Sequence, residues 1–167
     1  MTAPEPPKRA RSPYITAAGY RRLDAEAQAL WRRRGEVTRA LAAAAAEGDR
    51  SENAEYIYGK KQLREIDRRI RYLQKRLPEL KVVNALPADA QRVFFGAWVT
   101  LEDPAGTEVT YRIVGVDELD PAKNWISIES PVARALLKRT LDEELTVQTP
   151  GGEVRYCVVD VRYKLEN

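Results

Sequence analysis

Two carboxylates in a short polar stretch are the residues of this sequence best suited to chemistry. Asp49 and Glu52 lie three positions apart within AEGDRSENAEY, residues 46–56. If a helix begins near Asp49, the two side chains are neighbours on its first turn. Paired carboxylates can bind a hard cation such as Mg2+ or orient a water molecule bound to it. Two ligands are too few to hold Mg2+, so the sequence predicts half of a catalytic metal site, completed by another molecule.

The same spacing has a structural alternative. Asp-x-x-Glu at a helix start is a capping box, and both carboxylates are stabilised near the positive end of the helix dipole. Spacing alone favours capping, because caps are expected at every helix start. The long amphipathic segments on both sides favour the metal hypothesis, since a capped turn needs no rod behind it.

A run of basic residues follows the two acids. Eight Lys and Arg residues lie between Lys60 and Arg76, against two acids, Glu65 and Asp67. The candidate nucleic-acid-binding residues, named the basic stripe here, are Lys60, Lys61, Arg64, Arg68, Arg71 and Lys75. All but Lys61 fall within an arc of roughly 80° at 100° per residue, almost opposite the apolar positions. A solvated coiled-coil face normally mixes both signs, so a single-sign stripe favours binding to nucleic-acid phosphates or another polyanion.

Composition excludes several other kinds of site. The chain has no histidine and one cysteine, which rules out Ser-His-Asp catalysis, histidine metal sites and a structural zinc cluster. Cys157, between Tyr156 and Val158, is predicted to pack in a strand rather than act as a nucleophile. Four aromatic residues have strand spacing that favours core packing over base stacking: Phe94, Phe95, Trp98 and Tyr111.

Charge divides the chain into two parts. Residues 1–81 contain 19 Lys and Arg against 11 Asp and Glu, whereas the remainder has 9 against 14, which suggests different partners for each part. The sequence has no apolar run long enough for a membrane span and no signal-peptide core, so we expect a cytoplasmic protein without a membrane partner.

The acids and the basic stripe require a helical hairpin to position them. Residues 1–13 form a basic, proline-rich arm that we expect to be flexible, and a helix should run from Thr16, a good N-cap, to about Ala46. Gly48 suits a helix end, and a second helix should stop near Leu77 because Pro78 follows. Apolar residues alternate at three and four positions in both segments, which predicts an antiparallel coiled coil over residues 14–80 with an acidic tip at 47–55. The apolar positions are Tyr20, Leu23, Ala27, Leu30, Val37, Leu41 and Ala44, with Arg34 completing the alternation, then Tyr56, Gly59, Leu63, Ile66, Ile70, Leu73, Leu77 and Leu80.

The second part of the chain has strand periodicity. A linker, 81–91, precedes a domain at 92–167 with one helix near 131–139. The expected strands are 93–102, 108–116, 125–129, 145–149 and 154–163. Short strands interrupted by one helix predict a small antiparallel sheet packed on a helix, giving the whole chain an α+β fold.

Several blocks resemble a known family. They are GDRSENAEY at 48–56, KKQLREIDRRIRYL at 60–73, VFFGAWVTLED at 93–103, RIVGVDE at 112–118 and ISIESPVARALLKR at 126–139. In this order they resemble the bacterial transcript cleavage factors of the Gre family, the GreB branch in particular. The resemblance covers nearly everything after Tyr14.

The resemblance implies a fold and a role. It implies an N-terminal coiled coil and a C-terminal FKBP-like domain without isomerase activity. It implies a monomer that is not itself an enzyme, docked at the rim of the secondary channel of RNA polymerase. The acids matching Asp49 and Glu52 would help bind the second catalytic Mg2+, shared with polymerase and not expected on the free protein. Backtracked nascent RNA would then be cleaved endonucleolytically, which rescues arrested complexes.

Further residues are assigned by the same resemblance. The basic stripe would contact the extruded RNA 3′ segment, and Ser130, Pro131 and Arg134 would lie on the docking side of the second domain. The chain departs from the family pattern at Gly35, where the family has proline, which affects local helix curvature but not the tip. The arm before Tyr14 is also longer than the family needs.

Two alternative functions stay open. A Gre-fold regulator would occupy the channel and inhibit polymerase without cleavage, although the tip sequence matches the cleavage-competent form. A stand-alone nucleic-acid-binding module would bind free RNA in a salt-sensitive way and would not associate with polymerase.

Overall fold

The computed structural model describes residues 10–48 and 53–165. The chain separates into two compact units. The helical unit is Tyr20–Leu80, and the sheet unit combines Met1–Gly19 with Lys81–Asn167. We describe each unit by itself. In the described part of the chain, no helix is both long and apolar enough to cross a membrane.

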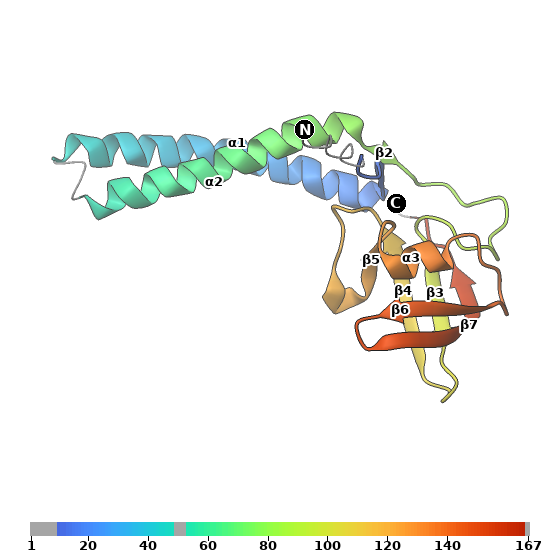
Figure 1. The fold of residues 1–167 in the computed structure, drawn as a ribbon. Helices are drawn as coiled ribbons and strands as arrows, with labels where there is room; N and C mark the ends of the chain where they lie inside the picture. The colour runs from blue at the N-terminus through green and yellow to red at the C-terminus, as the bar shows by residue number, and fades with distance from the viewer. Residues whose placement is uncertain (1–9, 49–52, 166–167) are drawn as a thin grey trace, which may run out of the picture. The chain divides into compact units, whose positions relative to one another are not determined.

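The helical unit consists of two long helices and a short one. Helix α1 is Ala17–Ala46, helix α2 is Ala54–Arg76, and the 3-10 helix η1 is Leu77–Glu79. Helices α1 and α2 lie side by side as a hairpin (Figure 1). Both predicted limits of the first helix and the predicted end of the second are confirmed: Thr16 directly precedes α1, α1 ends at Ala46, and α2 gives way to η1, which contains Pro78. Proline lacks an amide donor, so it is tolerated in the first turn of a helix and kinks or breaks a helix further in.

The predicted apolar spacing places its residues between the two helices. Val37, Ile66 and Ile70 form a buried cluster, with Leu30 and Leu63 packed against it. Near the acidic tip the helices approach closely, since a Cβ atom on Gly59 would lie 3.1 Å from Leu41 Cδ1.

Two ion pairs also join the helices. Arg34 Nε lies 2.7 Å from Asp67 Oδ1, and Arg69 donates to both carboxylate oxygens of Glu26 at 2.6 and 2.9 Å. Arg34 occupies one position of the apolar alternation. Its ion pair with Asp67 compensates the charge that it places between the helices.

The sheet unit is built on five strands. They are β3 (Trp98–Glu102), β4 (Glu108–Val114), β5 (Trp125–Ser127), β6 (Glu144–Thr149) and β7 (Gly152–Arg162). Their order is β5-β4-β3-β7-β6, and a 3-10 helix η2 (Pro121–Lys123) precedes β5. The expected α+β class is confirmed, with one refinement: β4 and β5 pair in parallel, whereas the other neighbours are antiparallel.

Helix α3 (Pro131–Leu136) completes the core of this unit. Ala133 and Leu136 are fully buried, and they join inward residues of the strands in one apolar cluster. The strand members with the least exposure are Val99, Leu101, Ile113, Val147 and Val158. Because side chains alternate along a strand, Thr100, Thr110 and Arg112 lie on the opposite face of the sheet.

Two very short strands lie outside the predicted sheet, one at the start of the predicted coiled coil and one in the predicted linker. β1 (Tyr14–Ile15) pairs in parallel with β2 (Lys81–Val82). Lys81 N donates to Pro13 O at 2.8 Å, and Val83 N donates to Ile15 O at 2.9 Å. The chain segments on either side of the helical hairpin are therefore hydrogen-bonded to each other within the sheet unit.

Candidate functional site

The connection between α1 and α2 contains the two acids predicted to act in catalysis. Asp49 and Glu52 lie outside the described residues, so their roles stay predictions. The expectation that the second helix begins near Asp49 is wrong, because α2 begins at Ala54. Its N-cap is Asn53, whose Oδ1 accepts the Tyr56 N–H at 3.2 Å. Neither acid therefore belongs to the first turn of α2.

Asn53 also fastens the two helices together. Its Nδ2 donates to Ala44 O at 2.9 Å, which satisfies a carbonyl in the last turn of α1. One side chain thus caps α2 and binds the end of α1, so it joins the two helices at this end of the hairpin. Sequence reasoning missed Asn53 in favour of Asp49, although asparagine is an equally favourable N-cap.

The basic stripe is exposed along α2. All six residues, Lys60, Lys61, Arg64, Arg68, Arg71 and Lys75, are classed as exposed. None of them takes part in an ion pair between residues that the structure describes. Lys60 Nζ lies 5.3 Å from the centre of the Tyr56 ring, a cation–π contact that leaves its charge in place.

Other arginines of the same helix behave differently. Arg69 is bound to Glu26, and Arg76 is buried with its Nη1 3.6 Å from Glu79 Oε2. The stripe is thus a face of one sign, which attracts polyanions through the summed field of its charges.

The three residues predicted to dock on polymerase come together on α3. Ser130 is the N-cap of this helix, and its hydroxyl accepts the Ala133 N–H at 3.1 Å. Pro131 and Arg134 are exposed, whereas Ala133 and Leu136 are buried. Helix α3 therefore buries one side in the core and leaves Pro131 and Arg134 on its open side.

The N-terminal segment lies next to this helix. Ser12 N donates to Glu129 Oε1 at 2.9 Å, one residue before the Ser130 cap. The segment that begins at Ala10 is therefore bound to the loop that leads into α3.

The aromatic side chains and the Cys157 thiol are involved in packing within the sheet unit. Trp98 and Trp125 enclose the guanidinium of Arg112, with ring centres 4.0 and 4.7 Å from Arg112 Cζ. Tyr111 packs against the core cluster. Burial raises the pKa of the Cys157 thiol, and the carboxylates of Asp142, Glu144 and Glu102 raise it further. The thiol therefore stays protonated at neutral pH, as expected for a packing residue.

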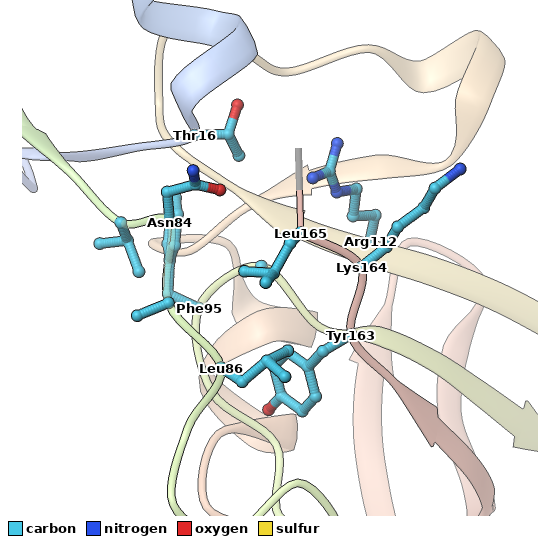
Figure 2. Close-up of a pocket in the computed structure, with 11 residues that line it drawn as sticks. Thr16, Asn84, Leu86, Phe95, Arg112, Tyr163, Lys164 and Leu165 are labelled. Atoms are coloured by element: carbon cyan, nitrogen blue, oxygen red, sulfur yellow. The ribbon is translucent and has the colours of Figure 1, made fainter. Parts of the chain in front are cut away.

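The cavity shown in Figure 2 is too small for a nucleotide. It lies in the sheet unit, has a volume of about 30 Å3, and has Thr16, Asn84, Arg112 and Leu165 around it. A volume of this size holds about one or two water molecules. Among the described residues no group of three or more potential metal ligands lies close together.

One buried carboxylate was not predicted as a site residue. Glu118, in the loop between β4 and β5, is 4% exposed and accepts hydrogen bonds from Thr16 and Gly115. Its partners lie 102 and three residues away in the chain, so no local pattern indicates the role.

Comparison with known proteins gives two family matches. The family model described as "Transcription elongation factor, N-terminal" matches residues 13–82, and "Transcription elongation factor, GreA/GreB, C-term" matches residues 88–163. The two matches together cover most of the chain.

Individual relatives agree with these matches. Transcription elongation factor GreB of Pseudomonas aeruginosa is 58% identical over 164 residues, which is 98% of each chain. Transcription elongation factor GreB of Yersinia pestis is 57% identical over 156 residues, covering 93% of this chain and 91% of that protein. A crystal structure of GreA factor homolog 1 from Thermus thermophilus is 26% identical, with a TM-score of 0.43 over 91% of this chain and 99% of that one. On the family matches and the high identity to GreB proteins, the chain belongs to the GreA/GreB family of transcription elongation factors.

Proposed function

We propose that this protein binds the secondary channel of RNA polymerase in the cytoplasm and stimulates endonucleolytic cleavage of backtracked nascent RNA. It acts as a monomer and is not itself an enzyme. It supplies acidic residues to the hydrolytic site of polymerase, and the new RNA 3′ end allows synthesis to resume.

The basic stripe is the observation that carries this proposal. Six exposed cations on α2 lack ion-pair partners among the described residues, although the same hairpin pairs Arg34 and Arg69 with acids. A phosphate backbone is the ligand that such a row binds most strongly, because binding neutralises several charges at once. These contacts do not read sequence, which suits a factor that must accept any transcript.

The acids at the tip suit a shared Mg2+ site. Residues 47–55 offer carboxylates and contain neither a thiol nor an imidazole, so their donors are the hard oxygens that Mg2+ prefers. Asp49 and Glu52 would hold one side of this ion, with the remaining ligands supplied by polymerase and RNA. When bound, Mg2+ lowers the pKa of the attacking water and neutralises charge on the phosphate.

The exposed side of α3 is the docking surface in this proposal. Pro131 gives a rigid apolar contact, and Arg134 gives a charge that can pair with a carboxylate of polymerase. Ser130 acts indirectly, since its cap at 3.1 Å holds the first turn of α3 in place.

The proposal is tested with a stalled, backtracked elongation complex in the presence of Mg2+. Adding the protein should shorten the RNA from its 3′ end and restore elongation after nucleotides are supplied. Inhibition of elongation without RNA shortening would instead identify a regulator that occupies the channel. Binding to free RNA without association with polymerase would identify a stand-alone nucleic-acid-binding module.

A further inference from the structure

A buried carboxylate holds the first residues of α1 in the sheet unit. Glu118 Oε2 accepts the backbone N–H of Thr16 at 3.1 Å and that of Gly115 at 2.8 Å. The Thr16 hydroxyl donates to Glu118 Oε1, and Thr16 Oγ1 accepts the Gly19 N–H at 3.0 Å. A buried charge is stable only when hydrogen bonds replace its water, and these three donors do so.

Two glycines make this approach possible. A Cβ atom on Gly19 would overlap Glu118 Oε1, and one on Gly115 would overlap Tyr14 O and lie 3.0 Å from Glu118 Oε2. The loop with Glu118 therefore packs directly on the backbone of the first turn of α1. Glu118 also places negative charge at the N-terminus of that helix, where the dipole favours it.

The neighbouring residues of the chain are held as well. Ile15 is fully buried, and it lies in β1, which pairs with β2. Figure 2 shows Thr16 at the start of α1, beside the cavity. Helix α1 then continues from Ala17 to Ala46, immediately before the acidic tip.

We propose that Glu118 is a positioning residue for RNA cleavage. It fixes the first turn of α1 in the sheet unit, so that the helix leading to Asp49 and Glu52 starts from a rigid attachment instead of a frayed turn. This inference rests on the proposed function. It predicts that weakening the attachment lowers the cleavage rate while leaving polymerase binding unchanged.

A pair of glycine substitutions tests the inference. Gly19→Ala pushes the Glu118 carboxylate away without removing it, whereas in Gly35→Ala the new Cβ meets only Arg39 Nη1 at 3.5 Å. Both changes favour helix formation, so a loss seen with Gly19→Ala alone cannot come from helix propensity.

A second pair removes charge instead of adding bulk. Glu118→Gln keeps the shape of the side chain and loses one acceptor. Glu143→Gln is its control, because Glu143 also binds a backbone N–H and a hydroxyl, both of Thr140, within the sheet unit.

Two measurements are made on each full-length variant. Hydrogen exchange reports whether the amides of residues 17–20 lose protection, and RNA cleavage is followed over a range of protein concentrations. We expect Gly19→Ala and Glu118→Gln to speed exchange at these amides and to lower the maximum cleavage rate about tenfold, as loss of positioning does. The concentration for half-maximal cleavage should stay within about twofold, and both control variants should match the wild type.

Three results would overturn the inference. They are wild-type cleavage rates in both Gly19→Ala and Glu118→Gln, a loss explained entirely by weaker polymerase binding, or unfolding of the whole sheet unit with no selective change at residues 17–20. Failure of the proposed function is distinguishable, since the wild-type protein would then stimulate no cleavage, whereas hydrogen exchange still reports on the attachment.

Discussion

At the scale of single residues, the Tyr163 hydroxyl links two distant segments of the sheet unit. It accepts the Phe94 N–H at 2.8 Å and donates to Arg92 O at 2.5 Å. It thereby joins the chain just after β7 to the segment that leads into β3. Burial raises the pKa of this hydroxyl above its ordinary value of 10.0, with a further contribution from Asp89, although the Phe94 bond lowers it.

Replacing Tyr163 with phenylalanine should destabilise the protein. The change leaves two half-buried backbone groups without their partner, which costs about 1–3 kcal/mol in the free energy of unfolding. Urea unfolding of Tyr163→Phe measures this loss, and Tyr58→Phe is the control because Tyr58 is 68% exposed. Since the folded-state pKa is raised, the contribution of the hydroxyl is present below pH 10 and is lost as the pH rises through the folded pKa. Equal stability of Tyr163→Phe and wild type at pH 7 would show that this bond does not stabilise the fold.

At the scale of elements, the hairpin depends on a small apolar contact between its helices. Ile70 is 4% exposed in the cluster with Val37 and Ile66. Truncating it to alanine removes buried methyl groups and leaves a cavity, so Ile70→Ala should lower the free energy of unfolding by about 2–4 kcal/mol. Ile57→Ala, at a position that is 55% exposed, should change it by less than about 0.5 kcal/mol. Thermal or urea unfolding followed by circular dichroism makes the comparison, and similar losses in the two variants would contradict the packing shown here.

The basic stripe gives a second prediction at this scale. Replacing Arg64, Arg68 and Arg71 with alanine should weaken crosslinking to the RNA 3′ segment. It should also weaken the dependence of RNA affinity on salt. The slope of log affinity against log salt concentration should fall by about 0.7 for each phosphate that the variant no longer binds. A matched loss of three charges on α1, at the exposed residues Arg22, Arg32 and Arg39, should have a smaller effect. Equal effects of the two sets would mean that net charge, and not the stripe, attracts the RNA.

Periodicity explains which elements the sequence could predict. Helices α1 and α2 follow from apolar residues repeated at three and four positions, and Thr16 and Pro78 mark their limits. Strands β1 and β2 are two residues long each, so they show no alternation and form only because distant segments meet. The parallel pairing of β4 and β5 is likewise a property of the chain path that local spacing does not contain.

Features of the candidate site that depend on residue type could be predicted from the sequence. Features that depend on contacts with residues distant in the chain could not. The stripe was visible because all but one of its basic residues share one face of α2, and their exposure agrees with that prediction. The start of α2 was misplaced because Asp49 and Asn53 are both good N-caps, and in the structure Asn53 is the cap. Glu118 was not predicted because its hydrogen bond to Thr16 joins residues 102 positions apart, and no local pattern around a single glutamate indicates such a contact.

At the scale of the whole molecule, each unit has a separate task in the proposed function. The helical unit carries the basic stripe and leads to the acidic tip, and the sheet unit carries the exposed residues of α3. Binding and cleavage stimulation should therefore be separable by substitution. Changes at Pro131 and Arg134 act on affinity for polymerase, whereas changes at the tip act on the chemical step.

The cleavage assay with tip variants tests the central claim most directly. A backtracked elongation complex is incubated with Mg2+ and saturating wild-type protein, the Asp49→Ala, Glu52→Ala double variant, or Glu36→Ala as an exposed acidic control outside the tip. We predict that the double variant lowers the cleavage rate about a hundredfold while binding polymerase within about twofold of the wild type. The control should cleave normally. Full cleavage by the double variant would contradict the claim that these two acids complete the catalytic site of polymerase.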